Sequence, residues 1–240
     1  MAESAILEGL NPAQLEAVTH TGGPLLVVAG AGSGKTRVIT RRIAYLIEQH
    51  DVSPFEILAI TFTNKAAGEM RERVGALVGP VVESMWVSTF HKACVQFLRR
   101  DAEYVGYPKR FTIYDQSDAV RLCGYVMRDL NIDPKRFPPR SVHAAISNAK
   151  NNNITAAEFA ESATGPHEKR IGSVFELYQH RLVTAAAMDF DDLLQRTVEL
   201  FRCHPEVLDR WRNRFRHLFV DEYQDTNPVQ NELCLRLARA

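Results

Sequence analysis

The chain has 240 residues, 45% of them hydrophobic and 24% charged, which is enough to bury a substantial core and excludes a disordered chain. Its 29 basic and 29 acidic side chains give a formal net charge of zero, so overall charge does not attract it to nucleic acid or membrane, and only a local patch could. The four cysteines form no C-x-x-C pair and no apolar run approaches the ~20 residues of a membrane span, so we expect free thiols and a soluble, cytoplasmic protein.

Four short apolar runs have the pattern of buried parallel strands. They are "LLVVAG" from residue 25, "ILAITFT" from residue 57, "MWVSTF" from residue 85 and "HLFVDE" from residue 217. Between the first two, Ile39, Ile43 and Leu46 recur at helical spacing, and residues 64–78 predict a second helix. Strand and helix therefore alternate as in a doubly wound α/β sheet, whose ligands bind beyond the carboxyl ends of the strands.

The stretch from about residue 92 to residue 213 has a helical pattern without a convincing series of strands. We interpret it as an all-helical insertion that divides the sheet domain in sequence. The expected organisation is a first sheet segment at 1–91, the insertion at 92–213 and a second sheet segment at 214–240. The asparagine run at 151–153 is interpreted as a loop.

The stretch "AGAGSGKT" after the first apolar run has the pattern of a phosphate-binding loop that opens a helix, with Ala29 where glycine is usual. Backbone N–H groups at the positive end of a helix suit a di- or triphosphate. Gly32 and Gly34 would let the backbone come close, and Lys35 would reach the terminal phosphates. Thr36 would offer its hydroxyl to Mg²⁺. Ala29 weakens the pattern little, because that position needs only a small residue; the alternative is a flexible Gly/Ser loop.

An acid pair, Asp221 and Glu222, follows the last apolar run in "HLFVDEYQD". On a parallel strand next to the loop's own strand, Asp221 would face Mg²⁺ and Glu222 would act as general base on the attacking water. A solvated acid pair at a strand end is the alternative. Together with the loop, the pair predicts hydrolysis of a nucleoside triphosphate.

Five motifs together resemble one family. "GLNPAQLEAV", "AGAGSGKT", "AITFTNKAAGEM", "VSTFHK" and "VDEYQDTN" are similar, in this order, to the early motifs of the UvrD/Rep/PcrA-type superfamily 1 DNA helicases. The resemblance covers essentially the whole chain and includes "FPPR" and "MDFDDLL" in the insertion. It implies an ATP-driven translocase that moves 3′ to 5′ on single-stranded DNA and serves repair or replication. The fold implied is a RecA-like P-loop NTPase sheet with a helical inserted subdomain.

The resemblance also implies the residues of the nucleotide site. ATP and Mg²⁺ would be held by the glutamine motif, the loop and the residue after it, and by the acid motif. The nucleotide-binding residues would be Gln14, Ala29, Gly30, Ala31, Gly32, Ser33, Gly34, Lys35, Thr36 and Arg37. Thr36 and Asp221 would hold the metal, and Lys35, Asp221, Glu222 and Gln224 would be catalytic. Gln224, with the two residues after it, would couple the nucleotide site to DNA-contacting elements.

Two of these residues have alternatives close at hand. Gln14 would read the adenine edge, but with Asn11 as N-cap and Pro12 at the first helical position it also completes a capping box. Both roles are compatible with each other. Arg37 would stack on the base or ribose, and the alternative is an exposed helix arginine.

The expected DNA contacts lie in the second and third motifs. Phe62 would stack on a base at a strand end, while Thr63 and Asn64 would contact phosphate at a helix N-terminus. The alternative is that Phe62 packs in the core and Asn64 caps the helix. By the resemblance, Thr89 and His91 would contact phosphate or sugar, whereas Phe90 could be core or stacking platform.

Two charged groups are interpreted as structural. Asp189 reads as an N-cap with acids in the first turn after it, rather than as part of a metal site. The arginines in the second group are interpreted as a solvated face, because no aromatic partners repeat among them; they are Arg210, Arg212, Arg214 and Arg216.

The family's third motif, its second RecA-like domain and the arginines that stabilise the transferred phosphoryl group do not follow the acid motif. We therefore expect the N-terminal portion of a longer helicase, a monomer that binds single-stranded DNA or DNA with a 3′ single-stranded tail. Alone it should hydrolyse ATP feebly or not at all. The alternatives are a stand-alone ATP and single-strand DNA binding module without motor activity, and the helicase part of a recombination nuclease. A GTPase is disfavoured, because "TNKAAGE" lacks the aspartate of a guanine-reading motif.

Overall fold

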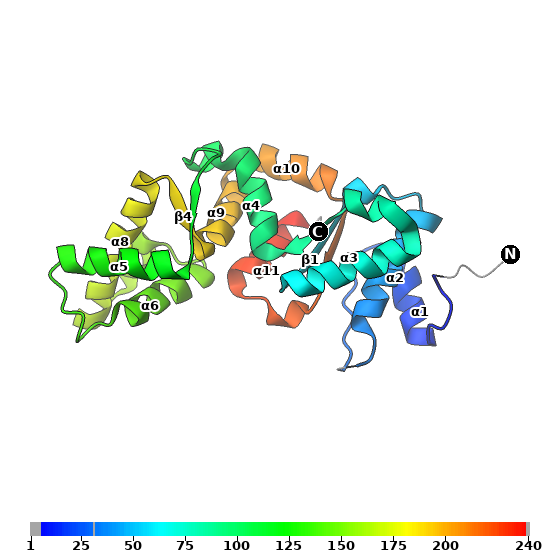
Figure 1. Cartoon of the computed structure of the whole chain (residues 1–240), viewed down its shortest axis with the longest axis horizontal. Helices are drawn as coiled ribbons and strands as arrows, with labels where there is room; N and C mark the ends of the chain where they lie inside the picture. The colour runs from blue at the N-terminus through cyan, green and yellow to red at the C-terminus, as the bar shows by residue number, and fades with distance from the viewer. Residues whose placement is uncertain (1–5, 31, 239–240) are drawn as a thin grey trace. The chain divides into compact units, whose positions relative to one another are not determined.

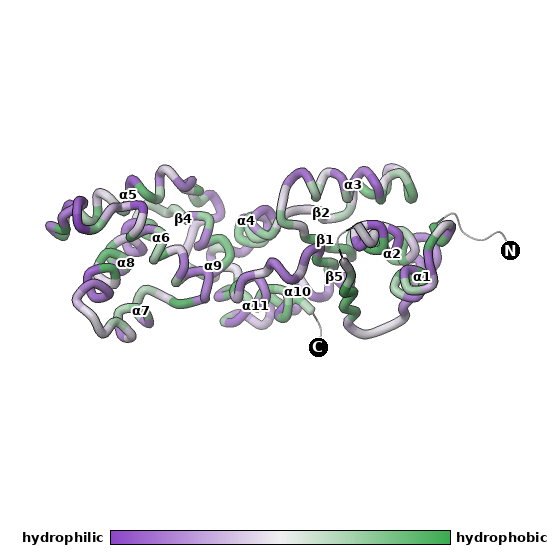
Figure 2. The backbone as a smooth tube through the Cα atoms, turned by 90° about the horizontal axis from the view of Figure 1, so that it is seen from below, coloured by the Kyte–Doolittle hydropathy of each residue, from purple (hydrophilic) through white to green (hydrophobic). Residues whose placement is uncertain are grey.

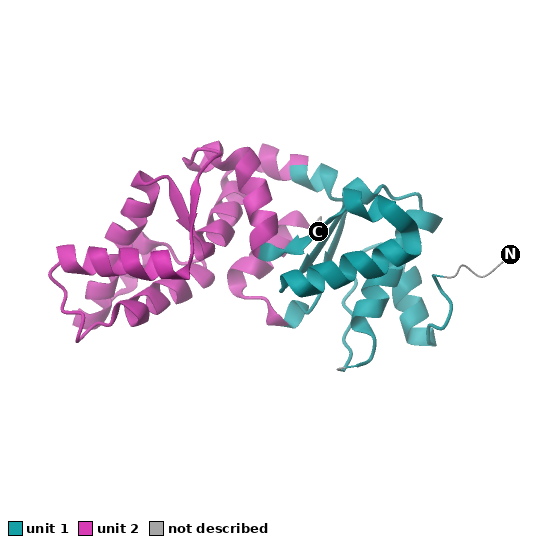
Figure 3. Ribbon diagram, in the orientation of Figure 1, with its two compact units in different colours: residues 1–90, 211–224 teal, residues 91–210, 225–240 magenta. Residues whose placement is uncertain are grey.

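The computed structural model describes residues 6–30 and 32–238. Figure 1 shows the helices and strands along the chain. The chain divides into two compact units, coloured separately in Figure 3. The first unit contains the residues up to Phe90 together with Trp211–Gln224, and the second contains His91–Arg210 and the residues from Asp225 onward. The segment expected at 214–240 is thus divided between the two units, because the chain after Gln224 packs on the helices of the second.

A three-stranded parallel sheet forms the centre of the first unit. Its strands are β1 (Ile57–Thr61), β2 (Trp86–Thr89) and β5 (His217–Val220), in the order β2-β1-β5. β1 is buried along its whole length because it has a neighbour on both sides, whereas β5 is only half-buried. Three of the four predicted strands are therefore confirmed.

The prediction of a strand in "LLVVAG" is wrong. Residues 24–30 pair with no strand in the described part of the chain, and Leu26 and Val28 are 71% and 86% exposed. The run is apolar, but hydropathy makes a strand only where a ladder partner is present. In Figure 2, which colours the backbone by hydropathy, green stretches occur in helices as well as in strands. Gly22 and Gly23 lead into the run with left-handed backbones, and Pro24 has no N–H to donate. As a consequence, β5 has β1 as its only neighbour among the described strands, and Asp221 does not follow a strand next to the loop's own strand.

The helices of the first unit pack on this sheet and on each other. They are α1 (Pro12–Thr19), α2 (Lys35–Gln49) and α3 (Asn64–Val78), with short 3₁₀ turns at Pro54–Glu56 and Gly79–Ser84. α2 and α3 confirm the two predicted helices. Ile43 of α2 and Met70 of α3 are fully buried beside Ala59 of β1, so the apolar faces of both helices meet in one core.

The second unit is mostly helical but not entirely so. Its helices are α4 (Phe90–Asp101), α5 (Gln116–Asp129), α6 (Pro139–Asn151), α7 (Ala156–Ser162), α8 (Pro166–Thr184), α9 (Phe190–Cys203), α10 (Pro205–Arg214) and α11 (Pro228–Leu237), of which α4 and α10 carry the chain between the units. Short 3₁₀ turns lie at Ala102–Val105 and Tyr223–Asp225. Two short strands, β3 (Thr112–Tyr114) and β4 (Ala187–Asp189), pair in parallel. They were missed because three residues are too few to show a strand period.

An ionic cluster is buried in the second unit. Asp189 caps α9, as predicted, and it also forms a capping box with Asp192. The partner that the sequence did not reveal is Lys150 at the end of α6, whose Nζ lies 2.8 Å from Asp189 Oδ2 and 2.9 Å from Asp192 Oδ1. The Tyr178 hydroxyl donates to Asp189 at 2.8 Å. All three charged side chains are at most 3% exposed, so water does not solvate them. The ammonium of Lys150 therefore balances the charge of the two carboxylates.

The asparagine run at 151–153 is more than a loop. Asn151 donates to Asp191 Oδ1 at 3.0 Å and accepts from Asn227 Nδ2 at 2.6 Å. Asn153 has a left-handed backbone and donates to Glu232 at 2.9 Å. The run therefore ties the end of α6 to the first turns of α9 and α11.

The four arginines at 210–216 do not form one solvated face. Arg210 pairs with Asp101, and Arg216 lies 3.7 Å from Glu56. Arg214 stacks over aromatic rings of the first unit, with its guanidinium 4.8 Å from the ring centre of Trp86. Its other two rings, those of Trp211 and Phe215, lie within the arginine stretch itself, and only Trp86 comes from a strand that is distant in sequence.

Candidate nucleotide and nucleic-acid site

The glycine-rich loop has a backbone that few residues can adopt. Gly32 and Gly34 have φ of 74° and 89°, in the left-handed region that glycine tolerates best. Gly34 is the N-cap of α2 and supplies no side-chain cap, so the first turn of the helix presents its N–H groups without one. This is the arrangement that favours an anion at a helix N-terminus. Ala31, also predicted to bind nucleotide, lies outside the described residues.

The side chains of the loop are folded onto its own carbonyl groups. Lys35 Nζ donates to the carbonyl oxygens of Ala29 at 3.0 Å and of Gly30 at 3.3 Å. Ser33 Oγ also donates to Gly30 O, at 2.6 Å. What Ala29 contributes here is a backbone carbonyl, which any residue supplies. This explains physically why alanine can stand where glycine is usual.

Asp221 lies at the carboxyl end of β5 and beside the first turn of α2. Its N–H donates to Ile60 O at 3.0 Å, which extends the ladder between β1 and β5. Burial raises the pKa of the Asp221 carboxyl, and the charge of Glu222 raises it further. The charge of Lys35 and a hydrogen bond with the Thr36 side chain oppose this rise. The structure thus brings Lys35 and Thr36 of the loop together with Asp221.

The oxygen atoms of Thr36 and Asp221 fit a magnesium ion. In the described part of the chain, no group of three or more His, Cys, Asp or Glu side chains is placed to hold a metal. Mg²⁺ does not need such a group, because it is commonly held by one or two protein oxygens, waters and substrate phosphates. A carboxylate whose pKa is raised by burial and by a neighbouring acid would also gain from a nearby cation.

Glu222 is held in an unusual backbone conformation. Its φ is 51°, in the left-handed region that non-glycine residues seldom occupy. The Gln224 side chain donates to Glu222 Oε2 at 2.6 Å, and the Glu222 N–H donates to Asp221 Oδ1 at 3.1 Å. Strained backbone of this kind occurs disproportionately at functional sites. Gln224 therefore sets the direction of the Glu222 carboxylate.

Gln14 contacts both its own helix and the loop. It completes the capping box of α1, with its N–H donating to Asn11 Oδ1 at 2.9 Å and its Oε1 accepting from Asn11 N at 3.1 Å. The capping alternative is thus confirmed. Its Nε2 donates to Ser33 O at 3.0 Å, so the amide lies against the glycine-rich loop. The contact with adenine stays a prediction.

Arg37 is exposed on the first turn of α2, and its Nη2 donates to Glu8 O at 3.4 Å. In this structure its partner is therefore the chain that precedes α1. Its stacking on a base or ribose stays a prediction as well.

Four of the five predicted DNA contacts belong to the first unit. Phe62 is half-buried at the end of β1, and its ring meets Phe90 edge-on at 5.5 Å. Phe90 is 1% exposed, which confirms the core alternative for that residue. Thr63 is the N-cap of α3 and accepts from Ala66 N at 3.1 Å. The alternative in which Asn64 caps the helix is wrong, because Thr63 has the extended backbone of an N-cap and Asn64 is already helical.

Asn64 is exposed on the first turn of α3, and Thr89 is half-buried at the end of β2. Both lie at carboxyl ends of parallel strands, where ligands of such sheets bind. Their contact with DNA is not tested by these positions and stays a prediction.

The fifth residue, His91, belongs to the second unit. Burial lowers the pKa of its imidazole, and the charge of Asp191 opposes this without reversing it. At neutral pH the ring is therefore uncharged and would reach a phosphate or sugar as a neutral hydrogen-bonding group. The ring lies edge-on to Phe190 at 5.9 Å. Phe190, at 44% exposure, is a further exposed aromatic side chain, and its place directly after the Asp189 cap is the signal for it in the sequence.

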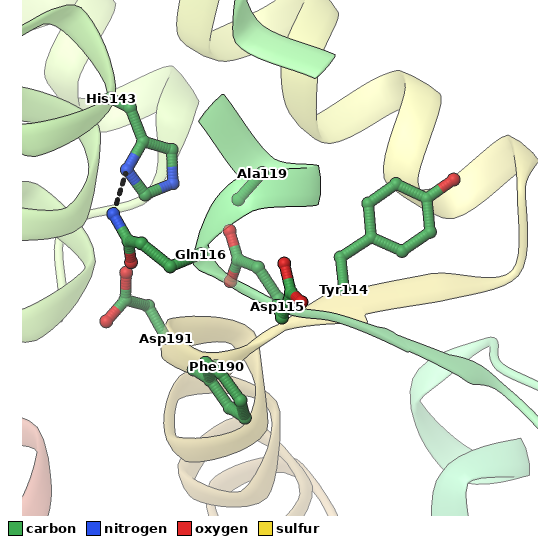
Figure 4. Close-up of a pocket in the computed structure, with 8 residues that line it drawn as sticks. Tyr114, Asp115, Gln116, Ala119, His143, Phe190 and Asp191 are labelled. Carbon is green, nitrogen blue, oxygen red and sulfur yellow. Dashed lines mark hydrogen bonds between the residues drawn. The ribbon is translucent and has the colours of Figure 1, made fainter. Parts of the chain in front are cut away.

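A small pocket lies beside Phe190 (Figure 4). Gln116 Nε2 lies 3.4 Å from His143 Nδ1 on one side of it. Its lining residues are Tyr114, Asp115, Gln116, Ala119, His143, Asp189, Phe190 and Asp191. None of the residues predicted to bind ATP or DNA lines it.

A glycine-rich loop that opens a helix beside a strand-end acid pair is the arrangement of the P-loop nucleotide-binding proteins. Comparison with known sequences narrows this class. The chain belongs to the family described as "UvrD/REP helicase N-terminal domain", whose profile matches residues 10–240. In the described residues, no helix is both long and apolar enough to cross a membrane.

Several curated relatives are named ATP-dependent DNA helicase PcrA. The protein of Staphylococcus aureus strain Mu50 is 51% identical over 235 residues, which are 98% of this chain and 32% of the relative. That of Bacillus subtilis strain 168 is 48% identical over 233 residues, 97% of this chain and 32% of the relative. The chain therefore spans about a third of the length of these relatives. They favour the helicase hypothesis over a stand-alone binding module.

Proposed function

We propose that this chain is the ATP- and DNA-binding N-terminal part of an ATP-dependent DNA helicase that moves 3′ to 5′ on single-stranded DNA in repair or replication. The observation that carries the proposal is the position of Asp221 of the acid motif beside Lys35 and Thr36 of the glycine-rich loop, both of which act on the pKa of its carboxyl. Two motifs far apart in sequence thereby form one site. The relatives named as helicases support the same function.

In this proposal the sheet segments at 1–91 and 214–240 form a RecA-like domain, and residues 92–213 form its inserted helical subdomain. The three parallel strands, with their polar residues at the carboxyl ends, support the first part. The helices of the second unit support the second part. We also place the protein's work in the cytoplasm, because its four cysteines are free thiols and three of them are buried.

The nucleotide site would bind the triphosphate through the backbone of the loop and the first turn of α2. Lys35 would leave the carbonyl groups of Ala29 and Gly30 and bond the terminal phosphates instead. Thr36 and Asp221 would hold Mg²⁺, which when bound neutralises charge on the phosphates.

Glu222 would accept a proton from the attacking water, and Gln224 would hold its carboxylate in place. The electron pair freed on the water oxygen would form the new bond to the terminal phosphorus as the bond to the leaving oxygen breaks. Gln224 donates to one carboxylate oxygen of Glu222, and the other oxygen would accept the proton.

The DNA site would combine a base stack with backbone contacts. Phe62 would offer the ring, and Thr63 and Asn64 would receive a phosphate at the N-terminus of α3. Thr89 and His91 would add contacts to phosphate or sugar. Partners would be single-stranded DNA or DNA with a 3′ single-stranded tail, bound by a monomer.

Binding, rather than turnover, is the direct test, because groups that complete catalysis in the relatives can lie in the two thirds that this chain does not span. We expect the chain to bind ATP with Mg²⁺ in isothermal titration, and Lys35→Ala to lose this binding while its circular dichroism spectrum is unchanged. The control is Arg121→Ala, which removes an exposed side chain of α5. Equal ATP binding by Lys35→Ala would refute the loop assignment.

For DNA, we expect Phe62→Ala to weaken binding of a single-stranded oligonucleotide by roughly 1 to 3 kcal/mol, measured by fluorescence anisotropy. Phe62→Tyr keeps a stacking ring and should bind nearly as the wild type does. If both variants bind equally well, no base stacks on this residue.

A further inference from the structure

Three arginines of α2 hold the N-terminal segment by its backbone. Arg41 Nη1 donates to Ile6 O at 2.5 Å, and Arg37 Nη2 donates to Glu8 O at 3.4 Å. Arg42 Nη1 donates to three carbonyl groups at the end of α1; they are those of Ala17 at 3.2 Å, Val18 at 3.1 Å and His20 at 2.8 Å. Every acceptor is a main-chain carbonyl, so these contacts fix the position of the backbone and do not depend on the side chains of the segment.

Arg42 donates hydrogen bonds to the last carbonyl groups of α1, which have no donor within the helix. The last carbonyl groups of a helix have no partner within the helix, and they carry its negative end. α1 has no basic residue in its last turn, so the half-buried guanidinium of Arg42 supplies both donors and positive charge there. A helix of eight residues is too short to be stable alone, so its orientation depends on such contacts and on Val18 packing against Val38 of α2.

The opposite end of the same short helix bears Gln14. Its side chain reaches the glycine-rich loop at Ser33 O, and a Cβ at Gly34 would come within 2.9 Å of its Nε2. The amide of Gln14 is thus in close contact with the loop at Ser33 and Gly34. A tilt of α1 released at its far end would move this amide relative to the nucleotide site.

We propose that Arg42 is a positioning residue for recognition of the nucleotide base: by holding the last carbonyl groups of α1, it fixes the place at which Gln14 meets adenine beside the loop. This inference rests on the proposed binding of ATP and on the adenine contact of Gln14. Arg42 itself lies about two turns along α2 from Lys35, and the hydrogen bonds that its Nη1 donates all go to the end of α1 and not to the loop.

The test separates the base from the phosphates. Affinities of the chain for ATP, GTP and inorganic triphosphate are measured by isothermal titration with Mg²⁺ present. Arg42→Ala should weaken ATP about tenfold, the loss expected for one or two hydrogen bonds, and change triphosphate affinity less than twofold. The preference for ATP over GTP should fall with it. Arg121→Ala on α5 is the matched control and should change none of the three affinities.

Two further variants guard against a purely structural effect. Arg42→Lys keeps a positive charge but not the forked guanidinium, so it should restore part of the preference for ATP. Gln14→Ala should lose the preference too, and the double variant Gln14→Ala with Arg42→Ala should lose no more than Gln14→Ala alone, because both act on one contact. Should Arg42→Ala fail to fold, Arg42→Lys and Arg42→Gln carry the same comparison.

The outcomes are distinct. Equal weakening of ATP and triphosphate, unchanged preference, or additive losses in the double variant would each overturn the role of Arg42. A wild-type chain that binds ATP and GTP equally would overturn it as well, because there would be no base contact to position. A wild-type chain that binds none of the three would instead refute the proposed nucleotide site.

Discussion

Two groups of acidic side chains, one in each unit, look alike in the sequence and differ in how their charge is balanced. Asp189 and Asp192 are buried around the ammonium of Lys150, so the protein supplies its own cation. Asp221 and Glu222 follow a strand, and the charge of Lys35 and hydrogen bonds oppose the rise in the pKa of Asp221 without cancelling it. An acid pair whose charge is balanced by a cation of the protein is structural. An acid pair without such a cation is suited to bind a metal ion.

The pKa directions of Asp189 and Asp221 express the same difference, while burial and the charge of Asp189 raise the pKa of Asp192. Burial alone would raise the pKa of Asp189, but the charge of Lys150 and its hydrogen bond outweigh burial and lower it. For Asp221, burial and the charge of Glu222 prevail, and its pKa is raised. The first acid is thus stabilised as an anion by folding, and the second is destabilised as one.

The largest effect that tests this comparison is the loss of the internal cation. Lys150→Met should lower the free energy of unfolding by about 3 to 5 kcal/mol in urea denaturation, because it leaves two buried carboxylates without the ammonium group that balances their charge. Arg121→Ala removes an exposed ion pair with Asp118 and should change stability by no more than about 0.5 kcal/mol. A similarly small effect for Lys150→Met would mean that water reaches the cluster.

The next effect is stabilisation by an external cation with its nucleotide. ATP with Mg²⁺ at one hundred times the dissociation constant should raise the free energy of unfolding by about 2.7 kcal/mol, seen as a higher melting temperature. Lys35→Ala should abolish this shift. A shift that persists in Lys35→Ala would show that ATP binds away from the glycine-rich loop.

A smaller effect is expected when the charge of Asp221 is removed. Asp221→Asn should unfold no more easily than the wild type at neutral pH, because it removes an anion that folding disfavours, and it should lose the dependence of ATP affinity on Mg²⁺. Asp189→Asn, the matched change in the other group, should be clearly destabilised. If both variants lost stability alike, the two acid groups would not differ as described.

The smallest effect is on pH dependence. The folded pKa of Asp221 is raised above its unfolded value, so its contribution to stability is fully present below the unfolded pKa and is lost as pH rises through the folded pKa. The difference in unfolding free energy between Asp221→Asn and the wild type should therefore grow in favour of the variant over that window. A difference independent of pH would show that Asp221 is not perturbed.

What the sequence predicts well are features set by near neighbours in the chain. β1 is a continuous apolar run, α2 and α3 have helical periodicity, and the Asp189 cap needs only residues of its own turn. Each of these follows from spacing within a few residues.

What the sequence does not predict depends on partners that are remote in the chain. The apolar run after Pro24 lacks a ladder partner among the described strands, so its hydropathy did not make it a strand. Lys150 lies 39 residues before Asp189, and the sequence pattern between them does not predict that they pair. At the candidate site, the loop and the acid motif were recognised by type, but only the folded chain shows Thr36 beside Asp221 and Gln224 on Glu222.

The left-handed backbone of Glu222 has a consequence for engineering. Such a conformation costs an ordinary residue about 1 to 2 kcal/mol, while glycine adopts it freely and asparagine more readily than most. A procedure that optimises thermal stability alone would therefore choose glycine or asparagine at this position and so delete the proposed base. At position 222, selection for stability and selection for activity therefore favour different residues.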